Sequence, residues 1–130
     1  MEMEIVFPGG ARVDAIANGM VITTNQDGTA PAPFGLFLAS IGTCAGIYVL
    51  SFCQQRGLPA EDIRIRQRMS VNPLTHMVEK ITLDIQLPPD FPEKYKEAVV
   101  RAAEHCAVKK HLENPPAFEV YTSVGEPASA

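Results

Sequence analysis

The sequence has 130 residues, a length that predicts a single domain spanning residues 1–130. Its hydrophobic fraction of 46% and charged fraction of 20% are typical of a folded globular protein and exclude a disordered chain. The formal net charge is −4 and no basic stripe is present, so we expect no nucleic-acid partner. The three cysteines are far apart and odd in number, and the N-terminus Met1-Glu-Met-Glu lacks a signal-peptide pattern. Together these features predict a cytoplasmic protein with reduced thiols.

Three short strands are predicted within residues 2–24, because apolar and polar side chains alternate there. Asn18-Gly19 separates the second strand from the third and is typical of a two-residue hairpin turn, in which both residues need a positive φ. Residues 25–33 are rich in Gly, Asp and Pro and predict a loop.

A long helix is predicted from Pro33 to Arg56, ended by Gly57 in the left-handed conformation and by Pro59. Residues 28–55 contain no charged side chain, a length that could span a bilayer. The prolines at its start, several hydroxyl side chains and the absence of basic flanks favour the buried centre of a soluble domain or dimer instead. We therefore expect no membrane association.

The second half of the chain predicts a hairpin, a helix and a last strand. Alternation from Ile63 to Val71 and from Lys80 to Leu87 gives a hairpin with one buried and one solvated face. Its three arginines, Arg64, Arg66 and Arg68, are interpreted as solvated, with acidic partners across the strands, rather than as an anion site. Asp90 and Glu93 have the spacing of a capping box at the start of the helix. Residues 118–124 alternate and predict the last strand, followed by a tail after Gly125 that is expected to fray.

The predicted order is therefore βββ-α-ββ-α-β, with strands in runs rather than alternating singly with helices. Such an order indicates an α+β fold with antiparallel sheets around a long central helix.

Two faces of the long helix differ in character. At about 100° per residue, small side chains line one face, which includes Gly42, Gly46 and Cys53 and allows the second helix or a second copy to approach closely. Cys53 on this face is interpreted as an inert core residue. Cys44 lies on the opposite face, between the hydroxyls of Ser40 and Tyr48, and is the candidate redox cysteine.

Cys106 ends the apolar stripe of the second helix and has basic neighbours in the sequence, among them His105 and Lys109. If a further short helix begins just after Cys106, its N-terminus and these cations would favour the Cys106 thiolate.

Two segments carry a resemblance to a known family. The first is Pro31-Ala-Pro-Phe-Gly-Leu-Phe-Leu-Ala-Ser-Ile-Gly-Thr-Cys-Ala-Gly and the second is Ala103-Glu-His-Cys-Ala-Val-Lys-Lys-His-Leu-Glu-Asn-Pro-Pro. They resemble the two cysteine motifs of the OsmC/Ohr family, the osmotically inducible and organic hydroperoxide resistance proteins, and the predicted strand order is similar as well.

The resemblance implies an intertwined homodimer in which Cys44 attacks an organic hydroperoxide and Cys106 resolves the product as a disulfide. An external dithiol would restore the two thiols. Arg12 loosely matches an arginine that assists the thiolate, although a strand-surface position is the alternative. The sequence departs from the peroxidatic members at Phe34, which stands where they have a glutamate.

Two alternative functions remain open. Phe34, Phe37, Tyr48 and Phe52 could line a pocket for a small apolar ligand at the subunit interface. Cys44, Cys106, His105 and His111 could form a metal site, although no C-x-x-C pair is present. We expect neither a metal nor another cofactor.

Overall fold

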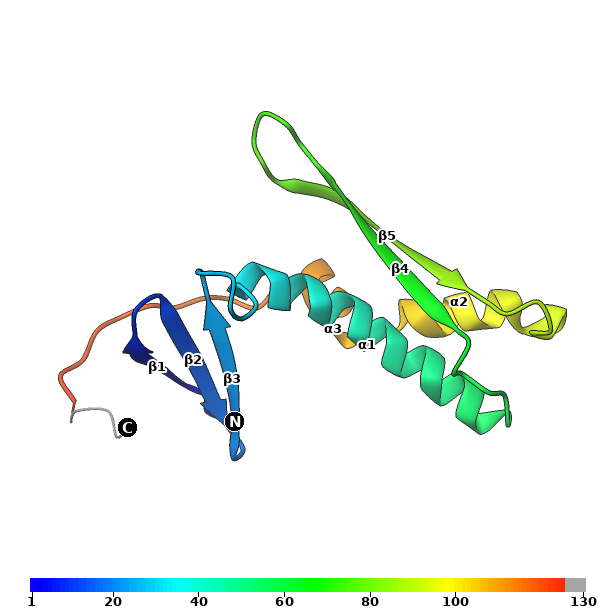
Figure 1. Cartoon of the computed structure of the whole chain (residues 1–130), viewed down its shortest axis with the longest axis horizontal. Helices are drawn as coiled ribbons and strands as arrows, with labels where there is room; N and C mark the ends of the chain where they lie inside the picture. Colours follow the sequence, from blue (N-terminus) through cyan, green and yellow to red (C-terminus); the bar gives the residue numbers. More distant parts are fainter. Residues whose placement is uncertain (126–130) are drawn as a thin grey trace. The chain divides into compact units, whose positions relative to one another are not determined.

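The computed structural model describes residues 1–125 and shows an α+β chain with antiparallel sheets (Figure 1). The described chain divides into two compact units, Met1–Leu38 with residues 117–125, and Ala39–Pro116. The tail after Gly125, predicted to fray, lies outside the described residues. A single domain over the whole chain stays a prediction.

The first unit contains a three-stranded antiparallel sheet of β1 (Glu4–Gly9), β2 (Arg12–Ala17) and β3 (Met20–Asn25). The predicted turn is confirmed, because Asn18 and Gly19 have φ angles of 51° and 75°. Ala15 pairs with Ile5 on one side and with Ile22 on the other, so these three residues stand in line across the sheet.

The long helix α1 (Pro33–Gln55) ends as predicted, one residue early. The Leu58 N–H donates to the Cys53 carbonyl at 2.9 Å and the Gly57 N–H to the Gln54 carbonyl at 3.4 Å. Gly57 has a φ of 65°, the left-handed conformation of this helix-ending motif.

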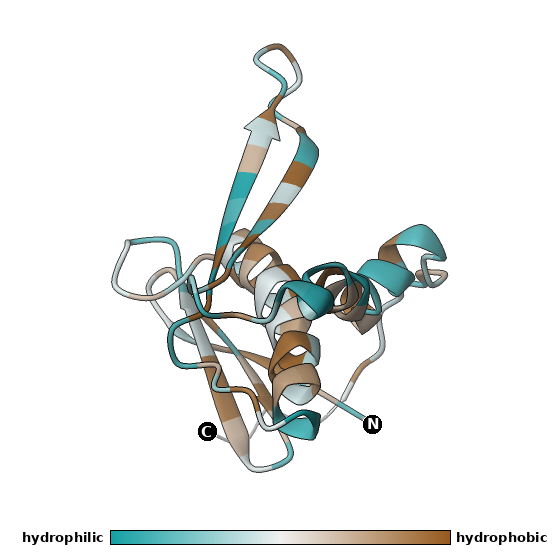
Figure 2. Cartoon of the chain, turned by 90° about the vertical axis from the view of Figure 1, so that its right-hand side faces the viewer, coloured by the Kyte–Doolittle hydropathy of each residue, from teal (hydrophilic) through white to brown (hydrophobic). Residues whose placement is uncertain are grey.

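The second unit contains the hairpin of β4 (Arg64–Val71) and β5 (Val78–Gln86), followed by the short 3₁₀ helix η1 (Glu93–Tyr95), α2 (Lys96–Glu104) and α3 (Ala107–Glu113). Apolar and polar bands alternate along both strands of the hairpin (Figure 2). On the polar face Arg68 lies 3.7 Å from Asp84, which confirms the predicted acidic partner across the strands.

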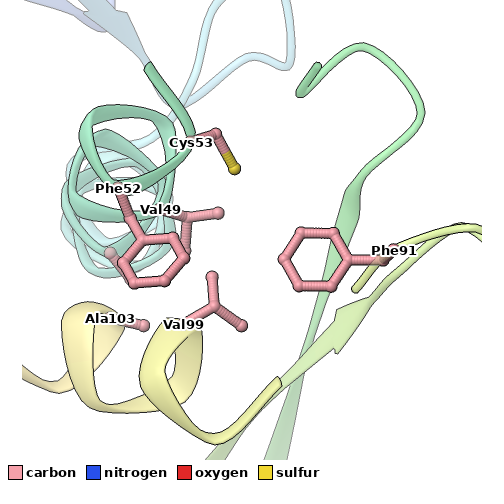
Figure 3. Packing of buried hydrophobic residues seen from close by; sticks show 7 residues of the cluster. Val49, Phe52, Cys53, Phe91, Val99 and Ala103 are labelled. Carbon is pink, nitrogen blue, oxygen red and sulfur yellow. The ribbon is translucent and has the colours of Figure 1, made fainter. Parts of the chain in front are cut away.

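The core of the second unit forms where α1 packs against α2 and the hairpin (Figure 3). Its fully buried members include Ala45 and Cys53 from α1 and Val99 from α2, each with 0% of its surface exposed. Burial raises the pKa of Cys53 and Arg56 opposes this shift, so Cys53 stays protonated as the predicted core thiol.

By length and composition α1 is also a helix that could cross a membrane. One side of it is buried in the second unit, through Ile41, Ala45, Val49, Phe52 and Cys53. On the other side Ile47 is 60% and Leu50 41% exposed. Within one chain α1 is therefore not buried on all sides, as a helix with apolar side chains all round would be. The second unit packs against only one side of it.

The predicted capping box at Asp90 is wrong. The residue that precedes η1 is Pro92, and no side chain caps that turn. Pro92 disfavours the helical conformation at the residue before it, Phe91, so Asp90 and Glu93 cannot belong to one helical turn.

The predicted last strand is also wrong for the described chain, because residues 115–125 form neither helix nor strand. Alternation indicates a face that can be buried, but a strand also needs an edge to pair with. The apolar side chains of this segment are almost fully exposed, at 88% for Phe118, 95% for Val120 and 105% for Val124.

The small-residue face of α1 meets β4 at Gly42 and Gly46, while Cys53 on the same face packs in the core with Val99 of α2, and an approach by a second copy stays a prediction. A methyl group built on Gly42 would overlap the Gln67 side-chain amide oxygen. One built on Gly46 would lie 3.9 Å from Ile65 Cδ1, an ordinary van der Waals contact.

We expect Gly46→Ala to raise the free energy of unfolding by about 0.5–1 kcal/mol, because alanine is the better helix former and its methyl group fits. Gly42→Ala is the matched control, with a smaller gain because the Gln67 side chain must move. Urea denaturation of the two variants measures both changes. A loss of stability in Gly46→Ala would contradict the contact with Ile65.

Candidate functional site: a pair of thiols

Two cysteines distant in the sequence interact through their side chains in the second unit. Cys44 lies on α1 and is partly buried, whereas Cys106 is 2% exposed and immediately precedes α3. The Cys106 thiol donates to the Ile41 carbonyl at 4.0 Å, less than one turn before Cys44 on α1, and it is close enough to Cys44 for each thiol to shift the pKa of the other. The structure thus brings together the two cysteines of the sequence prediction, while Cys53 lies in the core.

The surroundings of Cys44 favour its thiolate. The backbone N–H of Val108, in the first turn of α3, has the largest effect and lowers the pKa of Cys44. The Cys106 thiol and the Ala107 N–H lower this pKa further, and burial opposes them. A thiolate that accepts several hydrogen bonds is the reactive form of cysteine.

Cys106 has the opposite electrostatic balance. Burial raises the pKa of its thiol, and the hydrogen bond to Cys44 raises it further, while the N–H groups of Lys109 and Val108 lower it. The two thiols are therefore unequal: Cys44 loses its proton more readily than an ordinary cysteine, and Cys106 holds its proton more tightly.

This result corrects one sequence inference. A short helix does begin just after Cys106, and its first N–H groups lower the pKa of both thiols, but at Cys106 burial outweighs them and at Cys44 it does not. Contacts between segments distant in the sequence decide which thiol has the lower pKa, and no local sequence pattern predicts those contacts.

The other predicted site residues fall in different places. Arg12, Phe34 and Phe37 belong to the first unit, and Tyr48 to the second. Arg12 forms a two-pronged salt bridge with Asp14, with a shortest distance of 2.7 Å, and Phe34 packs on Phe37 with ring centroids 5.5 Å apart. Their roles in a site stay predictions.

An apolar cavity of about 590 Å³ adjoins the thiol pair on the side of Cys106. It is lined by side chains of β5, α2 and α3 that were not predicted as site residues, among them Ile81, Leu83, Ile85, Val100 and Leu112. The alternation along β5 identified its apolar face, but a gap between that face and two helices follows only from their packing.

A metal site of cysteine and histidine finds no support in the part of the chain that the structure describes. Residues 1–125 contain no group of three or more His, Cys, Asp or Glu side chains that could hold a metal ion. His111, one of the suggested ligands, lies with its Nδ1 atom 2.6 Å from the Ala107 carbonyl.

Together the fold and the site define an α+β protein with two thiols that meet between a long helix and a short one. The family model of OsmC-like proteins matches residues 26–121. The chain therefore belongs to the OsmC-like family.

Solved structures of similar fold support this assignment. A hypothetical protein from Aquifex aeolicus VF5 has a TM-score of 0.71 and 21% identity, over 88% of this chain and 87% of that chain. A protein from Psychrobacter arcticus 273-4, described as an osmotic stress induced and detoxification response protein, has a TM-score of 0.69 and 16% identity, over 83% and 85%. An OsmC-like protein from Mycoplasma pneumoniae has a TM-score of 0.62 and 15% identity, over 88% and 87%. No curated protein matches the sequence.

The unequal pKa values of the two thiols can be measured directly. We expect iodoacetamide to alkylate Cys44 with a pH midpoint below 9.0, the ordinary value for the thiol, because the Val108 N–H stabilises its thiolate, and Cys106 with a midpoint above 9.0. Peptide mass spectrometry at a series of pH values gives the rate at each cysteine. Cys53, completely buried and without a second thiol beside it, is the internal control and should react most slowly of the three. Equal midpoints at Cys44 and Cys106 would contradict the assigned roles.

Proposed function

We propose that this protein reduces organic hydroperoxides with its thiol pair, as part of a stress response. The observation that carries the proposal is the interacting pair itself, in which Cys44 has a lowered pKa and Cys106 a raised one. The family match and the detoxification role in the name of the Psychrobacter arcticus protein support the same function. A cytoplasmic location is part of this proposal, because the cytosol keeps thiols reduced.

In the first step the Cys44 thiolate attacks the terminal oxygen of the hydroperoxide ROOH. An S–O bond forms, the O–O bond breaks, and the alkoxide leaves as the alcohol ROH after it takes up a proton. Cys44 is oxidised to a sulfenic acid. The Cys106 thiol then attacks the sulfur of Cys44, so that a disulfide forms and water leaves. An external dithiol reduces this disulfide by exchange and is itself oxidised to a disulfide.

The cavity beside Cys106 supports an organic substrate over hydrogen peroxide. Its lining is largely apolar, although Asp84, Glu104 and Lys109 also contribute to it, and its volume of about 590 Å³ is within the range of small-molecule sites. The alkyl group of the hydroperoxide would lie there, with the O–O bond at the thiols. Tyr48 of the same unit remains a proposed substrate contact, and substrate contacts by Arg12, Phe34 and Phe37 of the first unit stay predictions.

The missing glutamate bears on how the thiolate is formed. Phe34 supplies no carboxylate at that position, and in this chain the Val108 and Ala107 N–H groups and the Cys106 thiol lower the pKa of Cys44. Hydrogen-bond donors alone favour a thiolate, so the proposed chemistry does not require the acid.

A homodimer completes the proposal. Large apolar side chains are exposed on several elements that a second copy would cover: Ile5, Phe7, Met20, Ile22, Ile47, Leu50, Phe118 and Val120. Exposed apolar groups in this number are typical of an unoccupied subunit interface. The unpaired alternating segment 118–124 supports an intertwined dimer, because it could pair with a strand edge of the other copy.

The second candidate function is the binding of a small apolar ligand without turnover. The cavity of about 590 Å³ favours it, because a cavity lined by Ile, Leu and Val can bind such a ligand whatever the thiols do.

The central prediction concerns turnover of cumene hydroperoxide with dithiothreitol. We expect Cys44→Ser to lower the rate by at least about 100-fold, since a hydroxyl is a far weaker nucleophile than a thiolate. Cys53→Ala is the matched control and should keep the wild-type rate. In Cys106→Ser, dimedone should label Cys44 after one equivalent of hydroperoxide, because no thiol can resolve the sulfenic acid. Equal, slow rates for wild type and Cys44→Ser would refute the proposal.

Native mass spectrometry tests the dimer and the second candidate together. We expect a mass of about 28 kDa, twice that of the 14.1 kDa chain, because the exposed apolar side chains need a cover. A monomer at micromolar concentration would contradict the dimer. A co-purified apolar molecule that Leu83→Lys abolishes would favour ligand binding, while a protein without ligand that turns over hydroperoxide would exclude it as the main function.

A further inference from the structure

A second cleft, shallow and open to solvent, lies between α1 and the end of α2. Its volume is about 240 Å³, most of its lining surface is apolar, and its lining residues are Tyr48, Ser51, Phe52, Gln55, Arg56, Ala102 and His105. This lining combines one permanent cation, an imidazole, two hydroxyls and an amide with an apolar floor. It contains no carboxylate.

Arg56 is held in place by aromatic contacts rather than by an acid. The carbon of its guanidinium group lies 3.7 Å from the ring centroid of Phe52 and 5.5 Å from that of Tyr95. Its Nη1 atom donates to the Phe52 carbonyl at 3.2 Å. Among the ion pairs within residues 1–125, Arg12, Arg68 and Arg101 each have a carboxylate partner, and Arg56 has none.

The neighbouring polar groups are also available to a ligand. In the described part of the chain, the side chains of Tyr48, Ser51, Gln55 and His105 form no hydrogen bond to the protein. An arginine stacked in a fixed orientation, with donors still open, has the geometry with which proteins bind carboxylates.

The charge and size of the cleft restrict the range of possible ligands further. One permanent cation balances a monoanion, whereas a phosphate dianion would leave a charge uncompensated. Phe52 and Ala102 offer apolar contact to a short carbon chain. The volume of about 240 Å³ lies below the range of drug-sized ligands, so the occupant is small.

We propose that this cleft is a binding site for a small organic monocarboxylate, whose carboxylate group lies on Arg56 and whose carbon chain lies over Phe52 and Ala102. The site is adjacent to the thiol pair, because Tyr48 follows Cys44 by one helical turn and His105 directly precedes Cys106. The proposal does not rest on peroxide chemistry and holds whether or not the thiols turn over.

The test uses sodium hexanoate as the probe and 1-hexanol as its uncharged counterpart, with the reduced full-length protein followed by NMR. We expect saturable shifts of the His105 ring and the Ala102 methyl signals with hexanoate, and binding at least about tenfold weaker with hexanol, because an arginine–carboxylate pair is lost. Shifts outside the cleft, or equal affinity for the two probes, would overturn the proposal.

Variants of Arg56 complete the test. Arg56→Gln should weaken hexanoate about tenfold, and Arg101→Gln, which removes a charge from α2 outside the cleft, should leave the affinity unchanged. If Arg56→Gln does not fold, Arg56→Lys replaces it and should still weaken binding severalfold, because an ammonium group cannot form the two-pronged contact. Unchanged affinity in the folded Arg56 variant would refute the site.

Discussion

The contact between α1 and α2 is the interaction on which the rest of this structure depends. Ala45 and Val99 are both completely buried there, and Phe52 of α1 packs edge-on against Tyr95. Burying a valine side chain contributes about 1.5–3 kcal/mol, so a few such residues suffice to hold two helices in register. Cys44 directly precedes Ala45, and Cys106 lies three residues beyond Ala103 of the same core. The core therefore places two thiols against each other that are 62 positions apart in the chain.

The break between α2 and α3 turns this proximity into an asymmetric pair. α2 ends at Glu104 and α3 begins at Ala107, so the first N–H groups of α3 have no partner within their own helix. The N–H of Val108 instead stabilises a negative charge on Cys44, while burial keeps the proton on Cys106. An unbroken helix would have used these N–H groups in its own hydrogen bonds. The two-residue interruption is thus the local feature that separates the nucleophile from the proton donor.

The features that the sequence predicted well are those decided by neighbouring residues. Asn18-Gly19 and Gly57 take the left-handed conformations that their turns require, whatever surrounds them. The prediction of a capping box at Asp90 was wrong because the spacing alone does not take account of the effect of Pro92 on Phe91. The prediction of a strand at residues 118–124 was wrong because alternation does not supply a neighbouring strand to pair with. In the site, both motif cysteines were identified, but the donor to Cys44 and the cavity along β5 were not. Each of these arises between elements distant in the chain, where no local pattern exists.

The exposed side of α1 links the proposed formation of a dimer to the proposed chemistry of Cys44. A thiolate held by hydrogen bonds is useful only if water does not compete for the same donors, and Cys44 is only partly buried within one chain. The exposed side chains on this side of α1, Ile47 and Leu50, are apolar. Ile47 follows Cys44 by three residues on the same helix. A second copy placed on that side would exclude water from the surroundings of Cys44 and bury the apolar residues at once. Dimerisation and thiolate stabilisation would then be coupled, because the same side of one helix serves both.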